Sequence, residues 1–297
     1  VSSVTGLGIP ELLEEIHRAV EAVHPRDSGG VFRMPIQRVF SAKGFGTVVT
    51  GIPLGGSTET GDLLEIVPLG ARGRVRGLHA YGEPVDQARA GHSSAVNLTD
   101  VDYRQVHRGM VLTEPGYFRG STLIEARLRC LPTNPRPLET QSSIRLHVGT
   151  AEALGKVHLL DAKSLGPGEE GFVQFRLEEP AVAAPGDRFV LRLHSPLETV
   201  GGGEVLGASR WRLKAGKPHV REMLERKEAA LAEPRLRVLA EIDSAPLVVP
   251  EKDVAVRVGL SGDEARDLVA SLMESGDAIA GSRPGTTVSR RRLEDAR

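Results

Sequence analysis

Residues 43–51 of the sequence read KGFGTVVTG. Two glycines, Gly44 and Gly46, flank Phe45, and the β-rich run at 47–50 then ends at Gly51. Glycine permits tight turns and close backbone approach, whereas β-branched residues fit a pleated, half-buried surface. This stretch therefore predicts a β-hairpin corner that leads into a strand.

The segments on either side extend the same pattern. MPIQRVF at 34–40 comes before the stretch, and a turn at Thr60, Gly61 and Asp62 leads into the apolar run LLEIV at 63–67. Short strands at regular spacing, separated by glycine, indicate a small closed β-barrel or a sandwich.

The run from MPIQRVF through GTVVTG to GDLLEI resembles the second domain of translational GTPases of the elongation factor Tu type. With KGFG ahead of TVVTG, it is most similar to selenocysteine-specific elongation factors. LHVGTAE, FVQFRLE and GDRFVLR further along resemble the third domain of the same factors. The resemblance implies a mostly β chain with C-terminal α structure: a GTPase-domain remnant at 1–25, elongation factor Tu-like β-barrels at 26–118 and 119–212, and a linker helix with a first winged-helix domain at 213–297.

The composition is consistent with several small β domains. The chain has 297 residues, enough for about two to three domains, and its many glycines and prolines favour turns between short strands. The formal net charge of −1 gives no overall basic field, so any RNA contact must be a local patch.

The single cysteine, Cys130, excludes an intramolecular disulfide and a cysteine-based zinc site. Alternation in STLIEARLRCL at 121–131 predicts that Cys130 points inward as inert packing. There is no run long and apolar enough to span a membrane and no leader, so we expect a cytoplasmic protein. Because the chain starts at Val1, we also expect a fragment.

The N-terminal residues predict a loop followed by a helix. Pro10 suits the first helical turn, and apolar residues recur on one face through Leu12, Ile16 and Val20. The resemblance implies that the loop with Ser2 and Ser3 is the last guanine-recognition loop of a GTPase domain. An ordinary N-terminal helix that docks on a barrel is the alternative.

The chain carries no phosphate-binding loop. GTAEALGKV at 149–157 has the wrong spacing and Val157 where a hydroxyl is needed, so it predicts a turn between strands. GGGE at 201–204 predicts a glycine-rich bend, and DSGG at 27–30 a linker rather than a serine nucleophile. The resemblance implies that GTP and Mg²⁺ bind only in the full-length protein; this chain alone should not hydrolyse GTP.

The resemblance places an aminoacyl pocket on the first barrel, and its candidate residues are Gln37, Arg38, His79, His92 and Ser93. Selenocysteine is largely a selenolate at neutral pH, and an anion that leaves water must be paired, so the pocket needs positive charge. The family usually has Asp-Arg at 37–38 and Gly-Gln-Arg at 91–93. One fixed cation, Arg38, remains here, and His92 could add charge if protonated. The pocket either selects selenocysteine with rearranged cations or has drifted to another aminoacyl group.

Three other groups of residues have plain structural interpretations. Arg72, Arg74 and Arg76 alternate with Val75, which predicts one solvated or RNA-facing strand face. The resemblance implies that the third domain packs on the second and contacts the acceptor and T arms of tRNA, and Arg188 and Arg192 lie on its GDRFVLRL strand. Arg188 could equally close a turn by pairing with Asp187. Trp211 is expected to cap the core at the end of the second barrel.

Helical spacing replaces alternation after Lys214. Ser261 and Glu264 form a capping box ahead of a helix at 262–275, and two short strands around an RPG turn at 283–285 follow. This order predicts a winged helix. Positive and negative charges nearly cancel over 211–297, so we expect a spacer module; the resemblance implies that the mRNA hairpin is bound by later winged helices absent from this chain.

The sequence as a whole predicts part of a selenocysteine-specific elongation factor that binds selenocysteinyl-tRNA and delivers it to the ribosome in a GTP-dependent manner. We expect a monomer without membrane contact. The alternatives are an aminoacyl-tRNA-binding paralogue with altered amino-acid specificity and a winged-helix nucleic-acid-binding regulator. A hydrolase would need a catalytic triad, and the sequence shows no pattern that indicates one.

Overall fold

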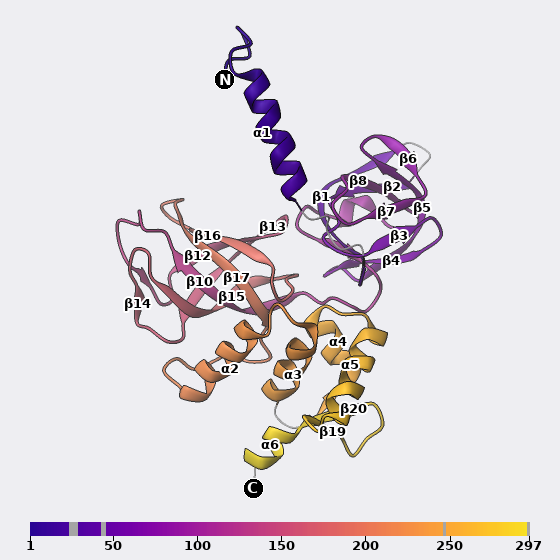
Figure 1. The fold of residues 1–297 in the computed structure, drawn as a ribbon. Coiled ribbons are helices and arrows are strands. Elements are labelled where there is room, and N and C mark those ends of the chain that lie inside the picture. The colour runs from indigo at the N-terminus through magenta and orange to yellow at the C-terminus, as the bar shows by residue number, and fades with distance from the viewer. Residues whose placement is uncertain (24–28, 43–45, 246–247, 296–297) are drawn as a thin grey trace.

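The structure is a computed structural model that describes residues 1–23, 29–42, 46–245 and 248–295. Figure 1 shows two barrels side by side, with a helical domain below them and an N-terminal helix that stands away from all three. The mostly β fold class with C-terminal helices is thereby confirmed. Of the predicted stretch at 43–51, residues 43–45 lie outside the described residues.

The first barrel has six strands, and it closes because β4 pairs with both β9 and β5. Its order is β4, β9, β1, β2, β8, β5, with β6 (Glu83–Val85) added beyond β5. Its interior is filled by apolar side chains such as Phe32, Ile36 and Val49. The barrel strands are β1 (Arg33–Ala42), β2 (Gly46–Gly51), β4 (Leu63–Val67), β5 (Ala71–Ala80), β8 (Ser94–Leu98) and β9 (Val111–Thr113). The shorter elements are β3 (Ser57–Glu59), β7 (Gln87–Arg89) and the 3-10 helix η1 (Tyr103–Gln105).

The second barrel is a closed ring of six antiparallel strands, β10, β15, β13, β12, β16 and β17. Cys130 is buried in its core, as predicted, and burial raises the pKa of the thiol. The strands are β10 (Ser121–Cys130), β12 (Ser143–Val148), β13 (Ala151–Leu159), β15 (Glu170–Ala181), β16 (Arg188–Leu193) and β17 (Thr199–Ala208). A separate pair is formed by β11 (Leu138–Glu139) and β14 (Ser164–Leu165).

Two glycine-rich segments are strands, contrary to prediction. Most of 149–157 belongs to β13, and only Gly149 and Thr150 form the turn before it. The GGGE segment lies within β17. A Cβ on Gly203 would come within 1.9 Å of the carbonyl oxygen of Arg127, and one on Gly201 within 2.4 Å of that of Arg129. These glycines therefore permit close strand contact rather than a bend.

The C-terminal domain combines helices with a three-stranded sheet ordered β18, β20, β19. The capping box at Ser261 and Glu264 is confirmed at the start of α5, which ends at Glu274. The elements are α2 (Pro218–Ala229), α3 (Pro234–Ser244), β18 (Val249–Pro250), α4 (Glu251–Val258), α5 (Gly262–Glu274), β19 (Ala278–Ala280), β20 (Thr286–Ser289) and α6 (Arg290–Asp295). Helices followed by a two-stranded hairpin are the order expected of a winged helix, and that assignment stays a prediction.

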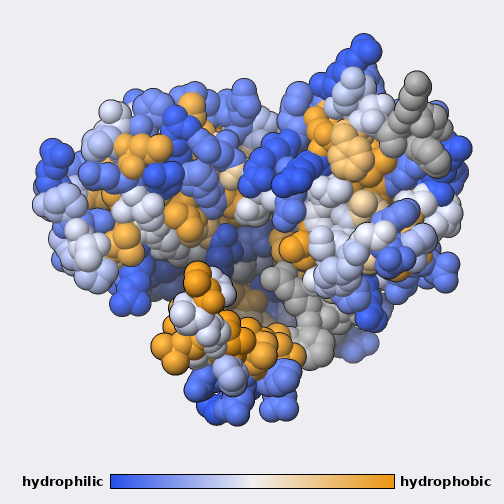
Figure 2. Space-filling view, turned by 90° about the horizontal axis from the view of Figure 1, so that it is seen from above, coloured by the Kyte–Doolittle hydropathy of each residue, from blue (hydrophilic) through white to orange (hydrophobic). Residues whose placement is uncertain are grey.

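Helix α1 (Ile9–Ala22) has no buried residue. Its apolar side chains, including Leu13, Ile16 and Val20, are exposed, and in Figure 2 apolar surface is visible on this protruding segment. In the described residues the helix therefore does not dock on a barrel, which contradicts the alternative interpretation of the N-terminus.

An ion pair joins the two barrels. The guanidinium of Arg33 on β1 makes a two-pronged contact with Asp187 just before β16, with Nη1 and Nη2 at 2.7 and 2.6 Å from the carboxylate oxygens. Both side chains are largely shielded from water, and the guanidinium also lies over the ring of Phe118. The prediction that Asp187 pairs with Arg188 is wrong, because Asp187 faces the other barrel.

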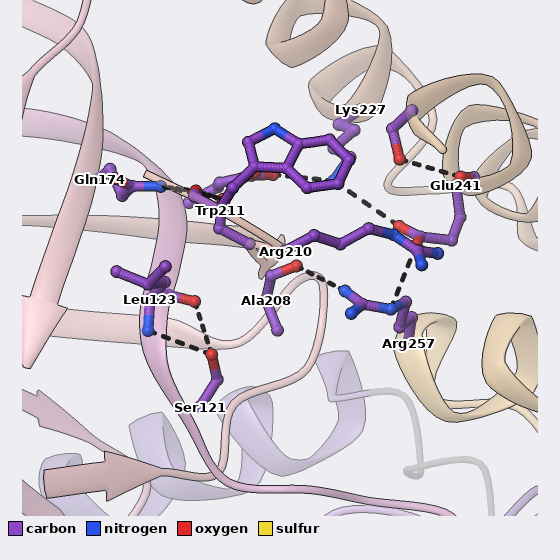
Figure 3. Close-up of polar contacts among 12 residues, drawn as sticks. Ser121, Leu123, Gln174, Ala208, Arg210, Trp211, Lys227, Glu241 and Arg257 are labelled. Atoms are coloured by element: carbon purple, nitrogen blue, oxygen red, sulfur yellow. Dashed lines mark hydrogen bonds and ion pairs between the residues drawn. The ribbon is translucent and has the colours of Figure 1, made fainter. Parts of the chain in front are cut away.

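A second, buried charge network joins the second barrel to the helical domain (Figure 3). Lys227 on α2 contacts Glu125 on β10 at 2.8 Å and Glu241 on α3 at 3.6 Å. Glu241 also pairs with Arg210 and Arg257. Burial disfavours the charged amine, but the two carboxylates outweigh it and raise the pKa of Lys227. Trp211, predicted to cap a core, lies beside this network and is 44% exposed.

We expect Arg33→Ala to lower the free energy of unfolding by roughly 3 kcal/mol, because it leaves the Asp187 carboxylate shielded and unpaired. Urea unfolding measures the change. Arg18→Ala removes an exposed pair on α1 and is the control, with an expected change below about 0.5 kcal/mol. Equal effects of the two substitutions would contradict the role assigned to Arg33.

We expect Lys227→Met to be more destabilising, by about 3–5 kcal/mol, because two buried carboxylates lose their shared cation. Lys252→Met on the exposed side of α4 is the matched control. If Lys227→Met unfolds at the same urea concentration as the control, the network does not hold the domains together.

Candidate functional site

The main candidate site is a groove of about 580 Å³ on the outside of the first barrel, which we call the outer groove. Strands β1, β2, β8 and β5 form its floor. Its size lies within the range of small-ligand sites, which are mostly apolar with a few polar groups. The lining residues are Phe40, Val48, Thr50, Gly77, His79, Tyr81, Gly82, Ser93, Ser94, Ala95 and Asn97.

Strand register builds the floor of the outer groove. One row across the four strands runs from Phe40 through Val48 and Asn97 to Gly77. The next row runs from Arg38 through Thr50 and Ala95 to His79. Paired residues of neighbouring strands point to the same face of a sheet.

Two predicted residues, Gln37 and Arg38, share the outer face because of a β-bulge. The register shifts between Ile36 and Arg38, so Gln37 is an extra residue in β1. Ile36 is buried, whereas Gln37 and Arg38 are both exposed, which strict alternation would not allow. Arg38 lies beside the outer groove, opposite Thr50; Gln37 is not among the residues that line it.

The rim of the groove is the two-residue turn Tyr81–Gly82 between β5 and β6. Both residues have positive φ, 53° for Tyr81 and 91° for Gly82, as a type I′ turn requires. The turn leaves the tyrosine ring 71% exposed, with its centroid 5.5 Å from that of the His92 ring. His79 Nδ1 lies 3.4 Å from the carbonyl oxygen of Gly82. Two predicted residues, His79 and Ser93, thus line the outer groove.

Next to this rim lies a cation that sequence reasoning missed. Arg89 Nε donates a hydrogen bond of 3.1 Å to His92 Nε2. The guanidinium of Arg89 thus places a fixed positive charge beside the rim, next to His92. The sequence feature that could have predicted this contact is the spacing: Arg89 lies three residues before His92, across the tight turn at 89–92.

Asn97 contributes a second feature that the prediction did not include. Among the described residues, its side-chain oxygen Oδ1 is buried and has no hydrogen-bond partner. Asn97 is also one of the residues that line the outer groove. Its sequence signal was the Asn-Leu end of strand β8.

The structure also places the predicted arginines of β5 and the serine of the N-terminal loop. Arg72, Arg74 and Arg76 are exposed while Val75 is buried, as predicted; Arg72 pairs with Glu65 and Arg74 bonds to a backbone oxygen. Ser2 forms a local turn in which its hydroxyl accepts a hydrogen bond from the Thr5 amide.

In the described part of the chain, no group of acidic, histidine or cysteine side chains could hold a metal ion. Nor does that part contain a helix long and apolar enough to cross a membrane.

Comparison with known proteins identifies the barrels. Residues 46–113 match elongation factor Tu domain 2, and residues 125–210 match the beta-barrel domain of selenocysteine-specific elongation factor. Two adjacent barrels with these matches define the class, an elongation factor Tu-like translation factor. The chain belongs to the selenocysteine-specific elongation factor family.

Individual relatives agree with this assignment. The chain is 39% identical over 206 residues to a selenocysteine-specific elongation factor of Desulfomicrobium baculatum, and 29% identical over 224 residues to one of Escherichia coli K12. These alignments cover 69% and 75% of this chain but only 32% and 34% of the relatives. The chain thus spans about a third of their length.

Solved structures give the same fold. A bacterial selenocysteine-specific elongation factor EF-Sec matches 99% of this chain and 45% of its own, with a TM-score of 0.74 and 25% identity. Translation elongation factor SelB from Methanococcus maripaludis, in its apo form, matches 69% of this chain and 49% of its own, with a TM-score of 0.63 and 26% identity.

The positive φ at Tyr81 leads to a stability prediction. We expect Tyr81→Asn to leave the protein equally stable or more stable, since Asn-Gly is the preferred type I′ pair. Tyr81→Val should cost about 1–2 kcal/mol, because a Cβ-branched residue is strained in this conformation. Urea unfolding of both variants tests this, and identical stabilities would argue against the turn geometry.

Proposed function

We propose that this chain is the tRNA-binding part of a longer selenocysteine-specific elongation factor, and that the outer groove holds the aminoacyl end of selenocysteinyl-tRNA. One observation supports this proposal most directly. The groove lies in the segment that matches elongation factor Tu domain 2, and it is lined by Asn97, whose buried Oδ1 has no hydrogen-bond partner among the described residues. In the longer protein, delivery to the ribosome is driven by GTP bound with Mg²⁺ in a separate domain.

The chemistry of an aminoacyl end suits the groove. Its α-amino group can donate a hydrogen bond to Asn97 Oδ1. This bond would remove the free-energy cost of leaving a buried acceptor without a partner. The apolar floor around Phe40 and Val48 accommodates the side chain and the ester region. Two guanidinium groups, on Arg38 and Arg89, border this space and favour an anionic side chain such as a selenolate.

One observation supports a second candidate, an aminoacyl-tRNA-binding paralogue with altered specificity. Ser93 lines the groove at the position where the family usually has arginine. The wall of the groove is therefore uncharged at Ser93. Arg89 is linked to this wall only by its hydrogen bond to His92. The two candidates differ in whether the bound side chain is an anion.

The remaining parts of the chain fit this role. The exposed apolar face of α1 suits burial against the rest of a GTP-binding domain, with the loop at Ser2 and Ser3 near the base. We assign 213–297 to a linker helix and a winged-helix spacer. Contact with the mRNA hairpin is then made by other winged helices of the longer protein, which acts as a cytoplasmic monomer.

A binding experiment with one tRNA carrying selenocysteine, cysteine or serine tests the proposal. We expect tightest binding with selenocysteine. Asn97→Ala should reduce the preference for aminoacylated over unacylated tRNA by about 5-fold, from the loss of one hydrogen bond worth about 1 kcal/mol.

Arg89→Gln should instead reduce only the preference for selenocysteine over serine, since it removes charge and leaves Asn97 in place. Arg72→Gln, a change of the same type at the Glu65 pair, is the control. Equal affinities for the three aminoacyl groups in the unmodified chain would exclude a selenolate-selective pocket and leave the paralogue. No preference for aminoacylated tRNA at all would exclude both.

A further inference from the structure

The junction between the second barrel and the helical domain holds more positive than negative charge. Its ion pairs join three cations, Lys227, Arg210 and Arg257, to two carboxylates, those of Glu125 and Glu241. Figure 3 shows the guanidinium groups of Arg210 and Arg257 converging on Glu241. One positive charge of this network is therefore in excess, and a charge removed from water needs a partner of opposite sign.

A fourth cation, Arg237 on α3, lies next to the network. Its Nη1 lies 3.5 Å from the carbonyl oxygen of Val258, which is a neutral acceptor. Burial lowers the pKa of Arg237, and the carboxylate of Glu264 opposes this effect only in part. Burial also lowers the pKa of Arg257 and outweighs the favourable effect of Glu241. A further negative charge at the junction would stabilise both guanidinium groups.

Two small cavities adjoin these cations. Both are lined by Lys227, Glu241 and Arg257. Arg237 lines the larger cavity, of about 20 Å³, and Arg210 lines the smaller one, of about 10 Å³. The Nε atoms of Arg237 and Arg210 are buried, and among the described residues neither has a hydrogen-bond partner. Each cavity thus adjoins an arginine with an unsatisfied donor.

The volume of the larger cavity restricts what it can hold. About 10–15 Å³ is enough for one water molecule, so this cavity admits a water molecule or a monatomic ion but no phosphate or sulfate group. Three cations and one carboxylate line it. A water molecule would satisfy an N–H donor and leave the excess charge uncompensated. A halide ion would do both, because it accepts hydrogen bonds and carries negative charge.

We propose that the larger cavity, which we call the junction cavity, binds a chloride ion. The Nε–H group of Arg237 would donate a hydrogen bond to the ion, and Lys227 and Arg257 would supply the compensating charge. These three residues lie on α3, α2 and α4, whereas Leu206, which also lines the cavity, lies on β17 of the barrel. The bound ion would therefore stabilise the contact between the helical domain and the second barrel.

Urea unfolding of the whole chain in sodium chloride, sodium bromide and sodium gluconate tests the proposal. All three salts are used at one ionic strength of about 0.1 M, so that screening of exposed charges is the same. Chloride and bromide should raise the midpoint relative to gluconate, which is too large for the cavity. At a chloride concentration about ten times the Kd, the ratio of unfolded to folded protein should fall about 11-fold.

Arg237→Met removes the proposed donor and one positive charge while it keeps apolar bulk. The difference between the chloride and gluconate midpoints should disappear in this variant. The midpoint in gluconate should stay the same or rise, because an uncompensated buried charge has been removed. Arg266→Met, which removes an exposed arginine of α5, is the matched control and should keep the difference. Since salts are compared within each variant, a change in overall stability does not obscure the result.

Anomalous scattering from crystals grown in sodium bromide locates the ion directly. A bromide peak in the junction cavity, together with the midpoint shift in solution, would support the proposal. A peak there without the shift would mean an adventitious ion only and would overturn it. Water in the cavity without a halide effect would also overturn it, as would a halide effect that Arg237→Met and Arg266→Met retain equally.

Discussion

The contact of Arg33 with Asp187 is the constraint on which the arrangement of the two barrels depends. Both charges are largely removed from water, so each needs the other, and the fork of the guanidinium allows only a narrow range of orientations. A small apolar cluster that includes Val31, Phe118 and Val182 surrounds the pair. Apolar contact is non-directional, whereas the two-pronged ion pair sets the angle between the barrels.

The same principle operates at the other junction. Lys227 and Glu241 lie on consecutive helices and Glu125 on a strand about 100 residues earlier, and their charges are tolerated in the interior only because they meet. Gln174 then fixes the connection that follows the second barrel. The helical domain and the second barrel are thus held in one arrangement.

The outer groove illustrates how far local sequence patterns reach. Alternation predicted the exposed arginines of β5 and the buried Cys130, and the resemblance brought His79 and Ser93 to the candidate pocket, where both line the groove. Arg89 and the free oxygen of Asn97 were missed, because a turn and a cross-strand row determine where they lie. The glycines of β17 were taken for a bend, since sequence does not show that another strand approaches them closely.

The sequence by itself determined the β-rich class, the positions of most strands and helices, the capping box of α5 and the family, because these depend on spacing and residue type along a short stretch. Only the tertiary structure decided that Asp187 pairs with Arg33 rather than with its neighbour Arg188, that His92 accepts a bond from Arg89, and that Lys227 lies between Glu125 and Glu241. Each of these contacts joins residues through strand register, a bulge or a domain junction. The energy of a charge depends on what surrounds it in space, and sequence spacing does not contain that information.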